Sequence, residues 1–495
     1  MADSSSSTNS STVTQRWGDV EDDPQEVEVE ESTSSSTPEN NNSSSTSAVE
    51  LPNLDSLAID DENTKKNDFL DEPEDTQISA VTSGDTLYST ATKFEDLNLS
   101  PELLKGLYIE MKFTRPSKIQ SISLPMILTP PYKDLVAQAH NGSGKTTCFV
   151  LGMLSRVDPN LKEVQALCIC PTRELAIQNM DVLKKMGKYT GITSFPAIPS
   201  GSARIPIPRM AEIKDQVVIG TPGRIRDLMS SKKLNTSHLK VLVFDEADHM
   251  LDDDGFKDDS LKIRKLMEKD KARYQVLLFS ATFSDTVRNF VSRVVKDGNQ
   301  MFVKKEELTL DVVKQYKVNC PNEQAKIDVI RDRIFELGEK LGQTIIFVKT
   351  RESANELHKK LGDYGYGCTT IHGAIEKDFR DKIVKEFRDG LTKVLISTDL
   401  LARGFDQSQI NLVINYNLPS KRDYPSDPDC EVYLHRCGRA GRFGRKGAVF
   451  NLLSTDREHM LLGKIEKHFG THIVEVPDWK SNEDFEQALK AAGLL

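Results

Sequence analysis

Short apolar runs that alternate with helical stretches constrain the fold of this chain more than any other feature. From Phe94 onward, a first series of such runs covers residues 134–139, 166–170, 217–220, 241–245 and 276–280. A second series covers residues 344–348, 368–371, 394–397, 412–416 and 448–453. Strands that alternate with helices are typical of βαβ units, which place the strands in a parallel sheet. The sequence therefore predicts an α/β protein with two open parallel-sheet domains.

Charge and composition predict where these domains begin and end. Residues 1–93 hold 21 acidic and 4 basic residues, whereas the rest of the chain holds 54 acidic and 61 basic ones, which gives net charges of −17 and +7. The Ser-rich acidic part cannot bury enough apolar surface to offset the entropy of ordering, so we expect a disordered extension over 1–93. We place the first domain at 94–303, a linker with the first strand region at 304–320, and the second domain at 321–495. A lone Trp17 in the extension could anchor a partner or be solvated.

The length of the apolar runs and the spacing of the cysteines limit the cellular compartments in which this chain is expected. No run of about 18 apolar residues appears, so we expect no membrane span. The N-terminus lacks a basic region followed by an apolar one and is not typical of a secretory signal. None of the seven cysteines forms a C-x-x-C pair. Structural thiols in a reducing compartment, the cytosol or the nucleus, are favoured over zinc ligands or disulfides.

A glycine-rich segment lies between the first apolar run and a helical stretch, and it reads Ala139-His140-Asn141-Gly142-Ser143-Gly144-Lys145-Thr146. This context is typical of a P-loop, whose backbone N–H groups approach phosphate at a helix N-terminus. Lys145 would then reach the β- and γ-phosphates of ATP, and the Thr146 hydroxyl would ligate Mg²⁺. A coincidental glycine-rich turn is the alternative, and Ala139 stands where a P-loop usually has its first glycine.

An acidic group follows the fourth apolar run of the first series: Asp245, Glu246 and Asp248 come directly after Val241–Phe244. A strand that ends in acids projects its carboxylates beyond the sheet edge, where open α/β folds bind ligands. Asp245 would hold Mg²⁺, directly or through water, and Glu246 would polarise the attacking water. A solvated acidic turn is the alternative.

Arginines and glycines alternate near residue 440, in Arg436-Cys437-Gly438-Arg439-Ala440-Gly441-Arg442. Arg439 and Arg442 are candidates to stabilise the charge that develops on a γ-phosphate. A plain basic loop is the alternative, but the interleaved glycines favour close approach of the backbone to a ligand.

Taken in order, these motifs resemble those of the DEAD-box RNA helicases over residues 94–470. The resemblance implies two tandem RecA-like domains and ATP as cofactor, with Mg²⁺. Phe113 and Gln120 match the family's Q motif, which implies that Phe113 stacks on adenine and Gln120 hydrogen-bonds its edge. The motif Ser280-Ala281-Thr282 matches the one that couples hydrolysis to domain closure, and Asp406 matches a ribose ligand.

The resemblance also implies which residues contact RNA. In the first domain these are Pro171, Thr172, Arg173, Thr221, Pro222, Gly223 and Arg224. In the second domain they are Lys349, Thr350, Arg351, His372, Gly373, Thr398 and Arg403. The expected ligand is single-stranded or short duplex RNA, bound mostly through phosphates and 2′-hydroxyls with low sequence preference.

Three positions depart from the family pattern. Lys112 replaces the glycine that usually precedes Phe113, and Lys377 replaces a glutamine after His372-Gly373. The double glycine expected between the two RNA motifs of the first domain is not evident in residues 200–209, which puts RNA contacts from that segment in doubt.

Within the family, the segments at residues 115–120, 218–223 and 315–318 resemble those of the mRNA-export branch. The Ser-rich acidic N-terminal extension looks plant-like. Members of that branch work at the cytoplasmic face of the nuclear pore, which implies localisation to cytoplasm, nucleus and the pore rim. Their partners are an activator that requires inositol hexakisphosphate and a nucleoporin. We expect an RNA-stimulated ATPase that acts as a monomer and opens short duplexes or remodels RNA–protein particles. A non-catalytic RNA clamp and a DNA helicase are the competing hypotheses.

Overall fold

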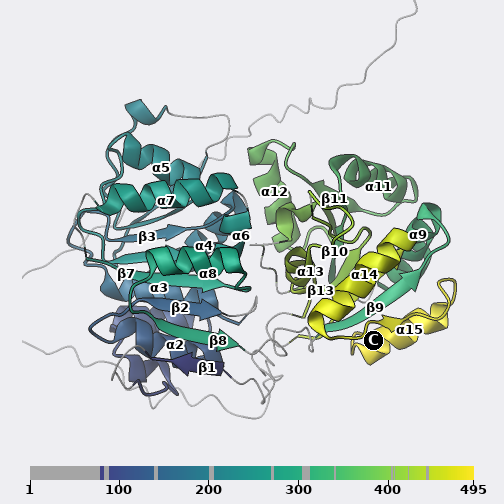
Figure 1. Cartoon of the computed structure of the whole chain (residues 1–495), viewed down its shortest axis with the longest axis horizontal. Helices are drawn as coiled ribbons and strands as arrows, with labels where there is room; N and C mark the ends of the chain where they lie inside the picture. The colour runs from purple at the N-terminus through teal and green to yellow at the C-terminus, as the bar shows by residue number, and fades with distance from the viewer. Residues whose placement is uncertain are drawn as a thin grey trace, which may run out of the picture. The chain divides into compact units, whose positions relative to one another are not determined.

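A computed structural model describes two sheets flanked by helices (Figure 1). It covers residues 78–82, 88–138, 143–199, 206–252, 254–268, 273–303, 313–338, 342–402, 405, 407, 409–421, 423–441 and 445–495. The first sheet has eight strands in the order β1-β8-β2-β7-β6-β3-β5-β4, and the second has seven in the order β11-β12-β10-β13-β14-β9-β15. The α/β class and the two parallel-sheet domains predicted from the sequence are confirmed.

The strands of the first sheet are all parallel except β1. They are β1 (Ile78–Val81), β2 (Leu135–Gln138), β3 (Ala166–Ile169), β4 (Ser194–Ala197), β5 (Val217–Gly220), β6 (Val241–Phe244), β7 (Gln275–Ser280) and β8 (Asn299–Val303). The α-helices among the described residues of this domain are α1 (Pro101–Lys105), α2 (Lys118–Leu128), α3 (Lys145–Arg156), α4 (Arg173–Met186), α5 (Pro222–Ser230), α6 (Ala247–Asp252), α7 (Asp254–Glu268) and α8 (Asp285–Val294).

The first sheet is buried on both faces, because successive residues of a strand point to opposite sides. In β2, Leu135 and Ala137 belong to the core beneath α2, α3 and α4, whereas Val136 belongs to the core beneath α5, α7 and α8. A strand covered on both faces needs apolar residues at every position. This requirement explains why the strands appeared in the sequence as continuous apolar runs.

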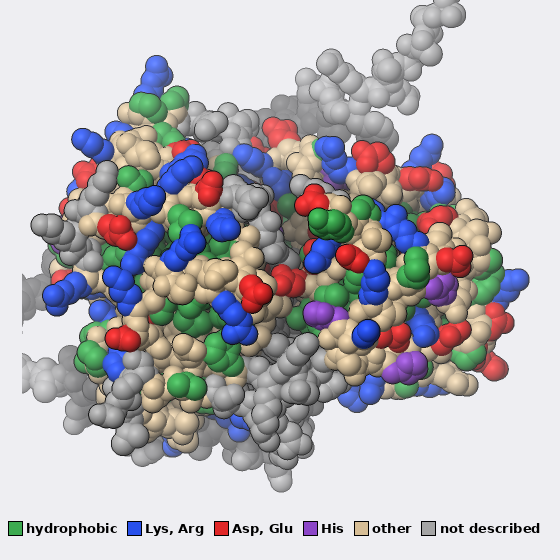
Figure 2. Space-filling model, in the orientation of Figure 1, with side chains coloured by type: hydrophobic (Ala, Val, Ile, Leu, Met, Phe, Trp, Pro, Cys, Tyr) green, Lys and Arg blue, Asp and Glu red, His purple; other side chains and the backbone are tan. Residues whose placement is uncertain are grey.

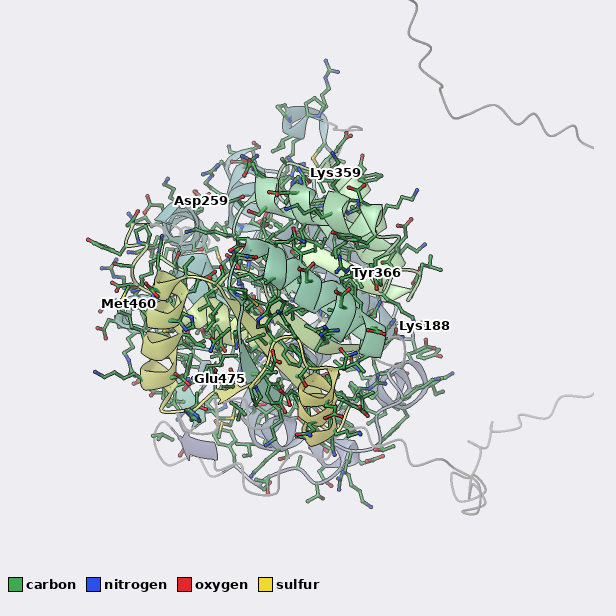
Figure 3. The ribbon with its side chains drawn as sticks, turned by 90° about the vertical axis from the view of Figure 1, so that its right-hand side faces the viewer. Lys188, Asp259, Lys359, Tyr366, Met460 and Glu475 are labelled. Carbon is green, nitrogen blue, oxygen red and sulfur yellow. The ribbon has the colours of Figure 1, made fainter. Side chains whose placement is uncertain are left out.

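The second sheet repeats this arrangement with parallel strands throughout. Its strands are β9 (Val313–Asn319), β10 (Gln343–Phe347), β11 (Cys368–Ile371), β12 (Val394–Ser397), β13 (Ile410–Asn415), β14 (Gly447–Leu453) and β15 (Val474–Glu475). Its helices include α9 (Glu323–Val329), α10 (Glu336–Gly338), α11 (Arg351–Asp363), α12 (Lys377–Arg388), α13 (Cys430–Cys437), α14 (Asp456–Phe469) and α15 (Asn482–Ala491). Figure 3 looks onto this domain, with Met460 on the outer side of α14 and Glu475 in the edge strand β15.

Three strands of the first sheet, β1, β4 and β8, lie outside the predicted series. β1 falls within residues 1–93, which we predicted to be a disordered extension, and it pairs antiparallel with β8 so that Ile78 lies opposite Val303. The first sheet therefore begins before the predicted boundary at Phe94. Residues 1–77, including Trp17, lie outside the described residues. In the second sheet, β9 lies within residues 304–320.

All seven cysteines have free thiols. Burial raises the pKa of Cys148 and of Cys437 to about 12, so both side chains remain thiols and pack as small apolar groups. In the ranges that the structure describes, no helix combines the length and the apolar character that crossing a bilayer requires.

A buried lysine of the second domain, Lys326, bonds to two other segments of that domain. Its contribution to the stability of the domain can be measured. Lys326 of α9 is fully buried, and its ammonium lies 2.7 Å from Glu458 Oε1 on α14 and 3.1 Å from the carbonyl oxygen of Tyr416. Replacing Lys326 with Met leaves Glu458 without its cation, so the free energy of unfolding of this domain should fall by about 3–5 kcal/mol. Urea unfolding followed by the fluorescence of Trp479, which packs against this core, measures the loss.

Glu323 provides the matched control, because it pairs with the same ammonium from the solvent side and its side chain is 55% exposed. Glu323→Gln should lower the stability by less than about 1 kcal/mol. Equal losses in the two variants would show that the buried pair is not the source of the stabilisation.

Candidate nucleotide and RNA site

Three neighbouring parallel strands bring the predicted nucleotide motifs to one edge of the first sheet. β7 lies between β2 and β6, and all three run in the same direction. The P-loop follows β2, the acidic group follows β6, and Ser280 ends β7. Gln138 at the end of β2 also donates from Nε2 to the carbonyl oxygen of Ala281, 3.1 Å away. Motifs separated by more than a hundred residues in the sequence therefore lie at the same sheet edge.

The described end of the P-loop carries a buried cation at a helix N-terminus. α3 begins at Lys145, after Gly144 with a φ of 97°. The Lys145 side chain is buried, and its ammonium has no hydrogen-bond partner among the residues that the structure describes. Thr146 occupies the first turn of α3 and Ser143 is buried. Gly142 lies outside the described residues, so its predicted phosphate contact has no structural account here.

The Q motif braces this loop from the side of α2. Gln120 accepts a bond from the Ser117 backbone N–H at 3.0 Å, which completes a capping box at the start of α2, and donates from Nε2 to the Gly144 carbonyl at 3.3 Å. Ser117 Oγ donates to the carbonyl oxygen of Ser143, 2.9 Å away. A Cβ atom at Gly144 would lie 2.4 Å from Gln120 Nε2, so this position requires glycine. The predicted adenine contact of Gln120 stays a prediction.

The two aromatic residues of the Q motif pack together. Phe113 stacks on buried Phe94, with ring centroids 6.4 Å apart and an interplanar angle of 21°. Lys112, which precedes Phe113, has a φ of 55°. That left-handed conformation is the one glycine adopts most easily, so lysine at this position carries a strain of about 1–2 kcal/mol.

The acidic pair after β6 is buried and electrostatically unfavourable by itself. Asp245 is 3% and Glu246 4% exposed. Burial, together with the neighbouring Glu246 carboxylate, raises the pKa of Asp245 to about 6, while the Lys145 ammonium and a hydrogen bond from Asn179 oppose the shift. Glu246 also has a φ of 51°, a strained backbone conformation for a residue with a side chain. Strain and buried like charges at one place are typical of a site built for a ligand.

Asp248 joins the acidic group to β7, a role that the sequence did not indicate. It is fully buried, and its Oδ2 accepts from the Thr282 backbone N–H at 3.0 Å and from Thr282 Oγ1 at 2.9 Å. Its own N–H donates to Ser280 Oγ, 3.1 Å away. Ser280 and Thr282, which we expected to couple hydrolysis to domain closure, are thus both bonded to Asp248. Their observed contacts are those of positioning residues.

The structure describes two arginines of the predicted motif. Arg439 is a candidate to stabilise charge on the γ-phosphate, and Arg436 forms bonds within its own domain. Arg439 is 1% exposed, and its Nε donates to the carbonyl oxygen of His435 at 3.0 Å while Nη1 donates to that of Phe405. Arg436 donates to Asp399 at 2.7 Å and to the carbonyl of Asn417 at 2.7 Å, so it holds its own domain together. Arg442, Asp406 and Arg403 lie outside the described residues.

The predicted RNA residues of the first domain surround two helix N-termini on the same sheet edge. β3 and β5 are neighbours, and α4 and α5 follow them. Thr172 caps α4 by accepting a bond from the Leu175 N–H, and Thr221 occupies the equivalent position before Pro222 in α5. Pro171, Gly223 and Arg224 flank these caps. Helix N-termini present free N–H groups and a partial positive charge, which suits phosphate.

The second domain repeats this pattern at the ends of three adjacent strands. β12 lies between β11 and β10. Thr350 caps α11 after β10, between Lys349 and Arg351, and Thr398 precedes a short helical turn after β12. His372 and Gly373 follow β11, and His372 Nε2 lies 3.2 Å from Asn355 Oδ1. The sequence-predicted RNA residues that the structure describes are therefore grouped at the carboxyl edges of both sheets.

Ion pairs connect the two domains and engage one predicted RNA residue. Arg380 of α12 donates to Glu174 of α4 across 2.8 Å, and both side chains are largely buried. The neighbouring Arg173 pairs with Asp381 and donates to the Pro199 carbonyl oxygen. Arg173 is thus committed to protein partners here, and its RNA contact stays a prediction. His435 Nε2 also lies 3.4 Å from Asp248 Oδ2.

Charge alone would not have located this edge. On the face shown in Figure 2, Lys and Arg side chains are interspersed with Asp and Glu over both domains. Dense mixed charge keeps a protein soluble but does not define a groove for a polyanion. The location of the candidate site therefore rests on the helix caps and strand ends, because the charges on this face do not mark a groove.

The donor set fits a nucleotide with Mg²⁺. Mg²⁺ in nucleotide sites is held by one or two protein oxygen ligands together with phosphates, rather than by a cage of side chains. The Asp245 carboxylate and the Thr146 hydroxyl supply such oxygens, and the unpartnered Lys145 ammonium suits phosphate. Among the described residues, no group of three or more His, Cys, Asp or Glu side chains forms a metal cluster of another kind.

Comparison with known proteins identifies the family. Residues 117–290 match the DEAD/DEAH box helicase model, and residues 325–444 match the helicase conserved C-terminal domain. The chain is 62% identical over 444 residues to DEAD-box ATP-dependent RNA helicase 38 of Arabidopsis thaliana, covering 89% of both chains. This chain belongs to the DEAD-box ATP-dependent RNA helicases. Like other members of that family, this helicase binds ATP.

Two solved structures relate this helicase to the Dbp5 branch. S. cerevisiae Dbp5 bound to RNA and ADP BeF3 matches with a TM-score of 0.74 and 39% identity, over 81% of this chain and 99% of that one. A point variant of S. cerevisiae Dbp5, bound to Nup159, a variant of Gle1, IP6 and ADP, matches with a TM-score of 0.57 and 38% identity, over 79% and 100%. The predicted fold and family are thereby confirmed.

The buried acid makes the nucleotide-free helicase sensitive to pH. Because the folded-state pKa of Asp245 is raised to about 6, ionised Asp245 lowers stability fully above pH 6, and this penalty shrinks as the pH falls from 6 toward 4. Asp245→Asn should therefore increase the free energy of unfolding at pH 7.5 by about 2–3 kcal/mol. The gain should be markedly smaller at pH 5.

Thermal unfolding in EDTA at both pH values, without nucleotide, measures this difference. Asp423→Asn removes an exposed carboxylate and is the control, with no expected change at either pH. A gain of equal size at pH 7.5 and pH 5 would exclude ionisation of Asp245 as its cause.

Proposed function

We propose that this helicase hydrolyses ATP with Mg²⁺ in a reaction that RNA stimulates, using the residues predicted from its sequence. The observation that carries the proposal is the buried Lys145 ammonium, which has no hydrogen-bond partner among the described residues and opposes the rise in the pKa of buried Asp245. A buried cation beside two buried carboxylates is stabilised when a phosphate and a metal ion enter together. MgATP supplies both charges.

The first domain supplies the binding groups. Lys145 and the backbone of Gly142, Ser143 and Gly144 would bind the phosphates, and Thr146 and Asp245 would hold Mg²⁺. When bound, Mg²⁺ would neutralise charge on the phosphate oxygens. Phe113 would stack on adenine and Gln120 would recognise its edge, in addition to its observed bonds to Ser117 and Gly144.

The chemical step needs both domains. Glu246 would polarise the attacking water, while Arg439 and Arg442 would stabilise charge on the γ-phosphate and Asp406 would bind ribose. Ser280 and Thr282 would act through Asp248, which they contact directly. Catalysis would consist of positioning and charge stabilisation, with no covalent intermediate.

RNA would bind along the carboxyl edges of the two sheets. The N-termini of α4, α5 and α11 would receive its phosphates, and Arg403 and Thr398 would contribute from the second domain. Binding through phosphates and 2′-hydroxyls would give low sequence preference. Closure of the domains on ATP and RNA would open short duplexes or remodel RNA–protein particles.

We further propose that this helicase acts in mRNA export, at the nuclear pore rim and in the cytoplasm and nucleus. Support comes from its similarity to S. cerevisiae Dbp5, which was solved with Nup159, Gle1 and IP6. The partners of this chain would then be an activator of the Gle1 type with inositol hexakisphosphate and a nucleoporin of the Nup159 type.

Replacing Glu246 separates binding from hydrolysis. Glu246→Gln keeps the shape of the side chain but removes the base, so RNA-stimulated turnover of ATP should fall about 10²–10⁴-fold while binding of ATP and RNA is retained. Phosphate release under multiple-turnover conditions and equilibrium titrations with fluorescent ATP and RNA measure the two effects.

Lys145→Ala is the matched comparison, because it should weaken nucleotide binding itself. Turnover by Glu246→Gln near the wild-type rate would reject the role assigned to Glu246. Lack of turnover in the wild-type protein with RNA present would favour the non-catalytic clamp.

The export assignment has a separate test. A Gle1-type activator should raise the ATPase rate at sub-saturating RNA, and the increase should require inositol hexakisphosphate, since the yeast complex contains both. Rates are measured with each component alone and with the two together. Stimulation by RNA without any response to activator and inositol hexakisphosphate would reject the export role and leave the RNA-stimulated ATPase intact.

A further inference from the structure

The side-chain amide of Asn179 is fully buried in the first domain and belongs to none of the predicted motifs. Asn179 lies in the middle of α4 and is 0% exposed, among the buried apolar side chains Leu175, Met180 and Leu183 of the same helix. A buried position on the apolar face of a helix normally carries an aliphatic side chain. Its Oδ1 has no hydrogen-bond partner among the residues that the structure describes. A buried acceptor left in this way costs about 1–3 kcal/mol.

The other end of this amide makes two bonds, and both lead toward the nucleotide site. Nδ2 donates to Asp245 Oδ2 at 2.7 Å and to Cys170 Sγ at 3.3 Å. The orientation of the amide follows from chemistry, because an ionised carboxylate only accepts hydrogen bonds and a flipped amide would oppose two oxygens. The bond to Asp245 is short, as expected for a charge-assisted bond.

These contacts fix one of the two oxygens of the Asp245 carboxylate. The Asp245 backbone is fixed as well, because its N–H donates to the Ile169 carbonyl of the neighbouring strand at 3.0 Å. With the backbone and Oδ2 both held, the direction of Oδ1 is determined. Groups that hold a metal-binding carboxylate in this way orient it and increase metal affinity.

We propose that Asn179 is a positioning residue that orients the Asp245 carboxylate toward the Mg²⁺ that accompanies the nucleotide. This inference rests on the proposed function, which assigns Asp245 to Mg²⁺. A packing role alone does not account for Asn179, because a leucine would fill the same space without leaving a buried acceptor unpaired.

The proposal is tested by comparing ADP binding with and without Mg²⁺ in Asn179→Leu. Binding of a fluorescent ADP to the full chain is titrated in excess Mg²⁺ and again in EDTA, and the ratio of the two affinities reports the metal contribution. In Asn179→Leu this ratio should fall about 10-fold or more, with the affinity in EDTA retained within about 2-fold. The half-saturating Mg²⁺ concentration should rise by the same factor.

Met180→Leu is the matched control, since Met180 is buried on the same helix and its thioether has no donor for a hydrogen bond to the Asp245 carboxylate. It should leave the ratio unchanged. Asn179→Ala should lower the affinity ratio in the same way as Asn179→Leu. It replaces the leucine variant if that variant shows no cooperative unfolding transition and is therefore not properly folded.

Two outcomes would overturn the inference alone. One is a wild-type ratio in both Asn179 variants, and the other is an equal loss of ADP affinity in Mg²⁺ and in EDTA, which would indicate a purely structural role. If Mg²⁺ does not strengthen ADP binding to the wild-type protein, the proposed metal site fails as well, and with it this inference.

Discussion

Parallel pairing of β2, β7 and β6 is the constraint on which the nucleotide site depends. Because the three strands run in one direction, the loops that follow them leave the sheet at the same edge. This places the P-loop, the acidic group and Ser280 side by side although more than 130 residues separate Lys145 from Ser280. The neighbouring strands β3 and β5 then put the predicted RNA helices beside them. One sheet edge therefore carries both the predicted nucleotide residues and the predicted RNA residues of the first domain.

The charges at this edge are arranged for a ligand rather than for the stability of the empty protein. Asp245 and Glu246 are buried next to each other, and burial raises the pKa of Asp245 to about 6. Glu246 adds a left-handed backbone, and the Lys145 ammonium forms no hydrogen bond within the described part of the chain. Such features destabilise a folded domain unless a ligand compensates them. The large apolar cores on both faces of the sheet supply the stability that tolerates them.

The sequence predicted the central strands well because they are buried on both faces. All ten predicted runs correspond to strands, from β2 to β14. It missed strands at or near the edges, where this requirement relaxes: β4 contains Pro196 and is partly exposed, and β1 is a four-residue antiparallel addition. The motifs located Lys145, Asp245 and the threonine caps. They could not reveal Asn179, whose role depends on a contact between residues 66 positions apart.

Helix α4 connects the predicted RNA residues and the predicted nucleotide residues of this sheet edge. Its first turn contains Arg173 and Glu174, which pair with Asp381 and Arg380 of the second domain. Asn179 follows in the same helix, about 8–9 Å further along the axis, and reaches Asp245. A helix is stiff over so short a distance. Moving one turn relative to the next would stretch the backbone hydrogen bonds that join residues four positions apart. Whatever engages the first turn of α4, RNA or the second domain, therefore acts on the same rigid element that holds the Asp245 carboxylate. Helix α4 thus carries the contacts to the second domain and the hydrogen bond to the Asp245 carboxylate within two turns of each other.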